Sequence, residues 1–174
     1  MSTPSSTAAR VVFIGAGPGE ADLITVRGAR LLAQAKVVLF DALADPSLRD
    51  MAPSADWIDV GKRGFSGKEG SDFNGQTRIN HLLVDHAQAV GAAHGPEAIV
   101  ARLKGGDPSL FGRLEEELAA LRDVGIDSEV VPGVTSALAA AAATQRPLTR
   151  RGTGRSVSFT TAMTRTGDLQ CGMG

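Results

Sequence analysis

The chain alternates between short runs of apolar residues and longer segments in which apolar residues recur every three or four positions. The short runs predict buried strands, and the longer segments predict helices with one apolar face. Because strands that alternate with helices form right-handed βαβ units, we predict an α/β fold with a mostly parallel five-stranded sheet flanked by helices. The expected strands span residues 11–14, 37–40, 57–60, 98–103 and 128–131. The expected helices cover about 24–35, 46–51, 79–90, 110–121 and 134–144.

The segments outside this pattern suggest how the chain is divided. Residues 1–9 are small and polar and predict a disordered tail, and residues 10–144 contain the α/β domain. Residues 145–155 carry four arginines and predict a basic linker. We expect residues 156–174 to hold the first strand, 156–160, and a stub of a second α/β domain that is otherwise largely absent. A lone strand cannot form a domain, so it must add to the sheet, pair with another chain or belong to a domain outside this sequence.

Composition narrows the function classes. The chain has 174 residues, of which 43% are hydrophobic, and a formal net charge of −1, so no nucleic-acid partner is expected. The single cysteine excludes a disulfide framework, and the five-residue spacing of His81 and His86 does not match a helical metal pair. No apolar run approaches the ~20 residues that cross a membrane, and the first residues lack a secretory signal pattern. We therefore expect a cytoplasmic protein with neither a metal nor a membrane partner.

The most informative stretch is Lys104-Gly-Gly-Asp107, a turn between a predicted strand and a predicted helix. Gly105 and Gly106 let the backbone approach a ligand without an intervening side chain. Asp107 followed by Pro108 favours a helix start, with Asp as the N-cap and Pro at the first helical position. In open α/β sheets, ligands bind at such turns beyond the carboxyl ends of strands. A tight turn in which Asp107 is only a cap explains the same residues without a ligand.

A second glycine-rich turn, Gly15-Ala-Gly-Pro-Gly19, follows the first predicted strand. A dinucleotide-binding turn needs a further Gly or Ala three positions after its second glycine, where this sequence has Glu20. Pro18 also removes a backbone N–H that a phosphate group would need. We therefore expect this turn to form the wall of a ligand site instead of a pyrophosphate cradle.

Polar residues at other element ends complete the set of candidates. Asp41 directly follows a buried strand, where a rigidly held carboxylate can act as a general base, although a simple turn aspartate fits as well. Lys62 follows the third predicted strand, and a solvated surface charge is the competing interpretation. Thr135 and Ser136 begin the last predicted helix, where they either cap it or hold a ligand through their hydroxyl groups.

These motifs occur in a specific order along residues 11–161. They are GAGPGE, LFDAL, VGKR, QxxIN, RLKGGDPSLFGR, EVVPGVTSALAA and PLT before the basic linker. The set resembles the S-adenosylmethionine-dependent tetrapyrrole methylases and, among them, is most similar to the uroporphyrinogen-III C-methyltransferases. That family has two α/β domains with the cofactor bound between them. This chain resembles the whole first domain, the tetrapyrrole methylase N-terminal domain, and only the first strand of the second.

The resemblance implies roles for particular residues. Asp41 matches the family's proposed proton acceptor, and Lys62 matches its proposed proton donor. The residues implied to contact S-adenosylmethionine are Pro18, Gly105, Gly106, Asp107, Leu110, Thr135 and Ser136. The implied reaction methylates uroporphyrinogen III at C2 and C7 without a metal ion and gives precorrin-2, the entry to sirohaem and cobalamin.

The resemblance also implies partners and leaves alternatives open. Intact members are expected to be homodimers, and their substrate bears many carboxylates. Cations that could complement these carboxylates are Lys62, Arg63, Lys68, Arg78, Lys104 and Arg113, with the linker arginines. Because half a pocket buries little of a ligand, we expect impaired turnover from this chain. The alternatives are a precorrin or cobalt-precorrin C-methyltransferase, a ribosomal-RNA methylase of the same fold and a non-catalytic remnant.

Overall fold

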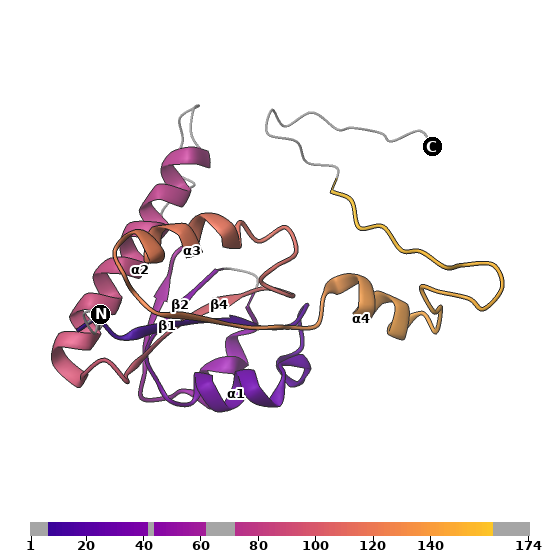
Figure 1. Cartoon of the computed structure of the whole chain (residues 1–174). Helices are drawn as coiled ribbons and strands as arrows, with labels where there is room; N and C mark the ends of the chain where they lie inside the picture. The colour runs from indigo at the N-terminus through magenta and orange to yellow at the C-terminus, as the bar shows by residue number, and fades with distance from the viewer. Residues whose placement is uncertain (1–6, 42–43, 62–71, 162–174) are drawn as a thin grey trace, which may run out of the picture. The chain divides into compact units, whose positions relative to one another are not determined.

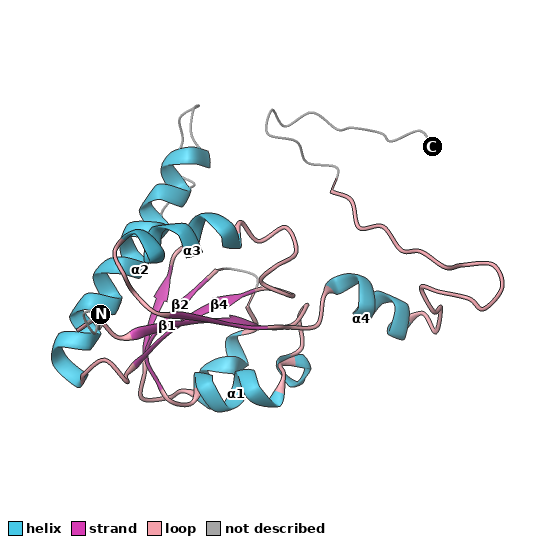
Figure 2. Ribbon diagram, viewed as in Figure 1, coloured by secondary structure: helices cyan, strands magenta, loops and turns pink. Residues whose placement is uncertain are grey.

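A computed structural model describes residues 7–41, 44–61 and 72–161, so most of the predicted tail, 1–9, lies outside the described residues. Strands and helices alternate along these residues (Figures 1 and 2). The strands are β1 (Arg10–Gly15), β2 (Ala35–Phe40), β3 (Asp56–Asp59), β4 (Ile99–Lys104) and β5 (Ser128–Val131). The α-helices are α1 (Val26–Leu32), α2 (Asp72–His94), α3 (Leu114–Asp123) and α4 (Ser136–Ala143). Two short 3-10 helices are η1 (Ala21–Leu23) and η2 (Pro46–Met51).

The part of the chain that the structure describes forms one five-stranded sheet in the order β3-β2-β4-β1-β5. Every pairing in this sheet is parallel, which confirms the predicted α/β architecture. β1 pairs with β4 from Arg10 opposite Ile99 to Gly15 opposite Lys104. Because parallel strands place their carboxyl ends at the same edge, the turns after β1, β2, β4 and β5 are neighbours there.

Helices cover both faces of the sheet, with α2 and α3 on one face and α1 on the other (Figure 2). Successive residues of β1 point to opposite faces. Val11 and Phe13 join the core beneath α2 and α3, whereas Val12 and Ile14 join the core beneath α1. All four side chains are fully buried, and burying a side chain of this size stabilises the fold by about 1.5–3 kcal/mol.

Helix α3 begins at Leu114, so the predicted helix start at Asp107 and Pro108 is wrong. Residues 107–113 form turns instead, and Phe111 and Arg113 adopt left-handed backbone angles, φ 55° and 51°, that cannot continue a right-handed helix. Between these two residues, a Cβ on Gly112 would lie 2.6 Å from the carbonyl oxygen of Pro108. The turn is thus tightly folded, and the helix starts only after it.

Helix α2 begins at Asp72 and ends at His94, so it extends beyond both ends of the helix that the sequence predicts over about 79–90. The side-chain amide of Gln76 donates to Asn80 Oδ1 at 3.0 Å, which is the spacing of one helical turn. Asn80 in turn donates to the carbonyl oxygen of Glu116 in α3 at 3.4 Å. These hydrogen bonds connect the first turns of α2 to α3.

The chain divides into two compact units, residues 1–136 and 137–174. In the second unit, α4 is followed by an antiparallel bridge in which Arg150 N donates to Gly154 O at 3.2 Å and Gly154 N donates to Arg150 O at 2.8 Å. Residues 155–161 have neither helix nor strand, so the predicted strand at 156–160 is not formed. A strand needs a hydrogen-bonded neighbour, and this segment is not among the strands of the described sheet.

Candidate functional site

Three glycine-containing turns pack against one another at the carboxyl edge of the sheet. They follow the neighbouring strands β4, β1 and β5, and they bring together Gly106, Gly133 and Gly15, the last residue of β1. A Cβ on Gly15 would lie 2.5 Å from the Cα of Gly133, and a Cβ on Gly133 would lie 2.2 Å from the carbonyl oxygen of Gly106. These distances exclude any side chain, so glycine is required for the three backbones to meet.

Backbone hydrogen bonds hold the first two turns together beyond the end of the sheet. Ala16 N donates to the carbonyl oxygen of Lys104 at 2.8 Å, and Gly106 N donates to the carbonyl oxygen of Gly17 at 2.7 Å. Gly17 and Gly106 have positive φ angles of 82° and 66°, which glycine adopts without strain. The pairing fixes the position of Pro18, which directly follows Gly17 and is partly exposed.

Asp107 connects the turn after β4 to the turn after β5. Its Oδ2 accepts a hydrogen bond from Gly133 N at 2.9 Å, and its Oδ1 accepts from the backbone N–H of Ser109 at 2.8 Å and from the Ser109 hydroxyl. Burial is the largest single influence and raises the pKa of Asp107, but the three hydrogen bonds together hold that pKa below its ordinary value. The carboxylate therefore stabilises the shape of this edge as an anion.

The structure brings most of the predicted cofactor residues to this edge. An ideal Cβ on Gly106 would lie 3.9 Å from the Cα of Thr135, so the β4 turn and the start of α4 are close. Gly105, Leu110 and Thr135 are partly exposed, and Ser136 is exposed. The backbone of Leu110 remains in the same turn, because its N–H donates to the carbonyl oxygen of Asp107 at 3.2 Å.

Of the two predicted catalytic residues, the structure describes Asp41 and not Lys62, which lies outside the described residues. Asp41 directly follows β2, the neighbour of β4, and so lies at the same edge as the glycine turns. Its side chain is 27% exposed, and its Oδ2 lies 3.7 Å from Nη1 of Arg102. This places a carboxylate between the solvent at the edge and a buried cation of the core.

Sequence reasoning missed a cluster of buried charges beneath this edge. Arg102 and Lys104 of β4 are 3% and 5% exposed, and Glu117 of α3 is fully buried. Glu117 accepts from Arg102 Nε at 3.1 Å through Oε1 and from Lys104 Nζ at 2.7 Å through Oε2. Burial is the largest influence on the pKa of Lys104 and lowers it, and the positive charge of Arg102 lowers it further. The Glu117 carboxylate raises this pKa, but the net result is a pKa below the ordinary value.

A signal for this cluster was present in the sequence. Glu117 lies three positions after Leu114 and four before Leu121, on the apolar stripe of its helix, where a carboxylate needs a buried partner. The cluster also corrects the expectation that Lys104 complements substrate carboxylates, because this amine is buried against Glu117. Arg113 is exposed, and it forms a bidentate ion pair with Glu116 through Nε at 2.8 Å and Nη2 at 2.9 Å.

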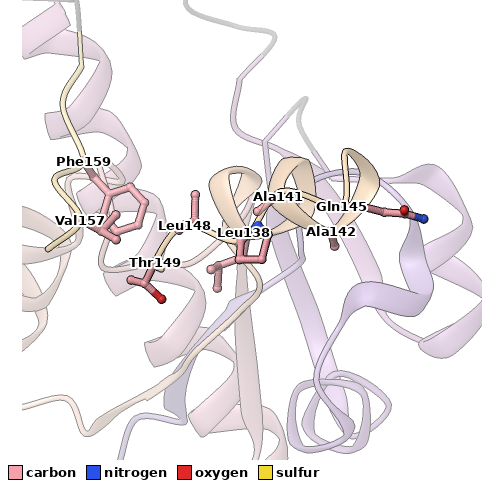
Figure 3. A pocket seen from close by; sticks show the side chains of 9 residues that line it. Leu138, Ala141, Ala142, Gln145, Leu148, Thr149, Val157 and Phe159 are labelled. Carbon is pink, nitrogen blue, oxygen red and sulfur yellow. The ribbon is translucent and has the colours of Figure 1, made fainter. Parts of the chain in front are cut away.

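The second unit contains a separate apolar groove of about 700 Å³ (Figure 3). Helix α4 contributes one wall, and the chain after it contributes the other. The lining residues are Leu138, Ala141, Ala142, Gln145, Pro147, Leu148, Thr149, Val157 and Phe159. None of the predicted site residues lines this groove.

Metal clusters and membrane-spanning helices are not found among the described residues. Within residues 7–41, 44–61 and 72–161, the structure shows no group of three or more His, Cys, Asp or Glu residues placed to hold a metal ion. No helix in the same ranges has the length and apolar character needed to cross a membrane.

Comparisons with known proteins connect this geometry to a family. The model of the tetrapyrrole (corrin/porphyrin) methylases matches residues 10–171. The uroporphyrinogen-III C-methyltransferase of Cyanidium caldarium is 42% identical over 160 residues, which cover 91% of this chain and 59% of that protein. The enzyme of the same name from Pseudomonas aeruginosa is 43% identical over 155 residues, which cover 89% of this chain and 58% of that protein.

A solved structure gives the same result. The uroporphyrin-III C-methyl transferase of Thermus thermophilus, complexed with S-adenosylhomocysteine, superposes with a TM-score of 0.63 at 42% identity, covering 83% of this chain and 51% of that chain. This chain therefore spans little more than half the length of the relatives it matches. Because the match runs from β1 through every turn of the carboxyl edge, the chain belongs to the tetrapyrrole (corrin/porphyrin) methylases.

Proposed function

We propose that this chain contributes to the S-adenosylmethionine-dependent methylation of uroporphyrinogen III at C2 and C7, which gives precorrin-2 for sirohaem and cobalamin synthesis. The observation that carries the proposal is the packing of three glycine turns at the carboxyl edge of the sheet, next to Asp41. Relatives that are 42% and 43% identical carry the name of this enzyme, which supports the choice of substrate.

The three glycine turns give the edge a fixed backbone shape. The positive φ angle at Gly106 requires glycine, yet the nearest atoms to an added Cβ, in residues 134 and 135, would be 3.9 Å away. A Cβ at this position would thus meet the chain after β5 at ordinary contact distance, whereas the carbonyl oxygen of Gly106 is packed closely against Gly15 and Gly133. We propose that Pro18, Gly105, Gly106, Asp107, Leu110, Thr135 and Ser136 hold S-adenosylmethionine, which supplies a methyl group activated by a positively charged sulfur.

Within this proposal, the chain's own residues align the reactants and remove a proton. When a ring carbon takes the methyl group, the tetrapyrrole becomes positively charged and must lose a proton. Asp41 is partly exposed at the same edge and provides a carboxylate for this step. Lys62 remains the proposed proton donor, and Asp107 orients the cofactor turn through Gly133 and Ser109. Alignment at the edge contributes more to such a transfer than acid–base strength does.

The cofactor part is tested by calorimetric titration with S-adenosylhomocysteine. Asp107→Ala removes the bond to Gly133 and is expected to weaken binding at least tenfold, or about 1.4 kcal/mol. Asp45→Ala is the matched control, because Asp45 accepts from Ser47 N at 2.8 Å and from its hydroxyl at 2.7 Å in the same local motif, in another turn. Equal affinity of the wild type and Asp107→Ala would contradict the proposed pocket.

The substrate part is tested by transfer of a labelled methyl group to uroporphyrinogen III, with precorrin and cobalt-precorrin substrates in parallel. Preference for uroporphyrinogen III supports the proposal, and preference for a precorrin supports the alternative enzyme. No binding and no transfer from a folded chain indicates the non-catalytic alternative.

We also propose that the chain acts as a cytoplasmic homodimer. The exposed apolar side chains of the second unit support self-association, since Leu138 and Phe159 line its groove and are 50% and 43% exposed. A single cysteine in the whole sequence suits a reducing compartment. Sedimentation equilibrium of the purified chain tests the dimer, and fractionation of the source cells tests the location.

A further inference from the structure

Two cations occupy positions of the central strand β4 where the pattern of burial calls for apolar side chains. All six residues of β4 are buried, and Ile99, Ala101 and Leu103 face the core beneath α1. Arg102 and Lys104 therefore alternate onto the opposite face, beneath α2 and α3, where Val100 joins the core. Buried charges are costly unless they are paired, so their presence in the middle of a sheet requires an explanation.

The guanidinium of Arg102 connects the core to the edge of the sheet. Its Nε donates to Glu117 Oε1 at 3.1 Å, and its Nη1 donates to the carbonyl oxygen of Leu103 at 2.9 Å. The same Nη1 lies 3.7 Å from Asp41 Oδ2, which is within ion-pair distance. A planar guanidinium with a fixed set of donors can reach these acceptors at once, which a lysine ammonium on a flexible stem cannot do.

Among the described residues, two carboxylates lie within ion-pair distance of these cations. Arg102 and Lys104 carry two positive charges, and Glu117 supplies one negative charge between them. Asp41 supplies the second negative charge, on the side of Arg102 that faces the edge. Glu117 of α3 thus forms ion pairs with both cations. Arg102 also forms an ion pair with Asp41.

We infer that Arg102 is a positioning residue for Asp41, anchored in the core by Glu117. The inference rests on the proposed function, in which Asp41 accepts the proton that the methylated tetrapyrrole releases. The ion pair holds Oδ2 of Asp41 at 3.7 Å from a guanidinium that is itself fixed in the core. Arg102 acts through this contact and does not itself touch the reacting atoms.

The test compares Arg102→Met with Lys104→Met as a matched control. Each variant removes one buried cation that bonds to Glu117 and leaves the other cation in place, so the change in buried charge is the same. Only Arg102→Met removes the ion pair with Asp41. Arg102→Lys is the third variant, because it keeps the charge but loses the guanidinium geometry.

The first readout is the 13C signal of the Asp41 carboxyl group in a chain labelled with [4-13C]aspartate, assigned by its loss in Asp41→Asn. Arg102→Met and Arg102→Lys are expected to displace or broaden this signal. Lys104→Met is expected to displace it less, because Lys104 acts on Asp41 through its charge and forms no ion pair with it. An unmoved signal in Arg102→Met, or an equal displacement in Lys104→Met, overturns the inference. Circular dichroism and S-adenosylhomocysteine affinity establish that each variant is folded.

The second readout is methyl transfer to uroporphyrinogen III. Arg102→Met is expected to lower kcat about 100-fold with little change in either KM, because Asp41 acts after both reactants are bound and a misplacement near 1 Å has an effect of this size. Arg102→Lys is expected not to restore the rate. A displaced Asp41 signal with an unchanged kcat contradicts the positioning role. Failure of the wild type to transfer methyl groups contradicts the proposed function, while the 13C signal still decides the contact.

Discussion

Glu117 provides the most direct test of how the buried charges contribute to stability. Glu117→Gln keeps the size and shape of the side chain and removes the one charge that contacts both Arg102 and Lys104. Arg102 retains Asp41 and the carbonyl oxygen of Leu103 as acceptors. Lys104 loses the ion pair that its ammonium forms at 2.7 Å. The variant therefore leaves a buried ammonium without a counter-charge in contact.

The expected loss of unfolding free energy lies between about 3 and 5 kcal/mol. Removing one partner of a buried ion pair costs about 3–5 kcal/mol, because the remaining charge stays desolvated. An independent upper bound comes from the proton on Lys104, since the amine becomes neutral when its charge is too costly. An amine with the ordinary pKa of 10.5 loses its proton at pH 7 at a cost of about 5 kcal/mol, since each pH unit below the pKa adds ~1.4 kcal/mol. Burial lowers the pKa of Lys104 and so reduces this cost, which makes the value an upper bound.

The assay is urea unfolding at pH 7, with Glu116→Gln as the control. Glu116 is the adjacent residue of α3, but its ion pair with Arg113 is exposed, so its loss is expected to cost less than about 1 kcal/mol. The slope of free energy against urea should be the same in all three proteins, since the surface exposed on unfolding does not change. Equal losses in the two variants, or a loss below about 1 kcal/mol in Glu117→Gln, would refute the argument from buried charge.

The pH dependence of the same experiment has a defined sign. Burial lowers the pKa of Lys104 in the folded chain, so between that pKa and 10.5 the unfolded chain binds more protons than the folded chain. The free energy of unfolding therefore rises with pH across this interval. Loss of Glu117 lowers the folded pKa further and widens the interval, so the difference between Glu117→Gln and the wild type should shrink as the pH rises toward 10.5.

Three further predictions concern other parts of the first unit. Gly133→Ala places a Cβ 2.2 Å from Gly106 O, so it should lower the free energy of urea unfolding by about 1–3 kcal/mol and weaken cofactor binding. Gly19→Ala is the control and should change neither quantity, because no atom lies within 4 Å of its added Cβ. Arg49→Ala removes a guanidinium that lies 5.2 Å from the ring centre of Phe40 and 5.6 Å from that of Trp57. The free energy of unfolding should fall by about 0.5–1 kcal/mol. The fluorescence of Trp57, the single tryptophan of the sequence, should change as well. The pKa of Asp107 is lowered in the folded chain, so its carboxylate stabilises the fold above the ordinary pKa of 3.8. This stabilisation disappears as the pH falls through the folded pKa. In an acid titration, the free energy of unfolding should therefore fall more steeply for the wild type than for Asp107→Asn.

Much of the fold follows from local patterns in the sequence. The apolar runs of β1, β2 and β4 are largely buried because helices cover both faces of these inner strands. The edge strands β3 and β5 are only partly buried. Alternation with helices was enough to predict parallel pairing, and parallel pairing was enough to place the turns after the strands at one edge. The glycines of two of these turns and the position of Asp41 were therefore recognisable before any coordinates.

Helix α3 shows where local patterns fail. Asp107 and Pro108 are good helix-start residues, and Asp107 does accept the N–H of Ser109, as a cap would. The helix nevertheless begins at Leu114, because residues 111 and 113 adopt left-handed angles on either side of Gly112. Packing of Gly112 against Pro108 and Lys104 imposes this geometry, and propensity does not report such contacts.

The α/β class, the order of the elements and the family can be read from the sequence, because each depends on residue types at fixed separations along the chain. The partners of the charged residues depend on the three-dimensional packing. Lys104 and Arg102 belong to β4 and Glu117 to α3, and their contacts exist because the sheet and helix bring them together out of water. A pattern along one element reports which side of that element is buried, and it does not report which residue of another element lies opposite.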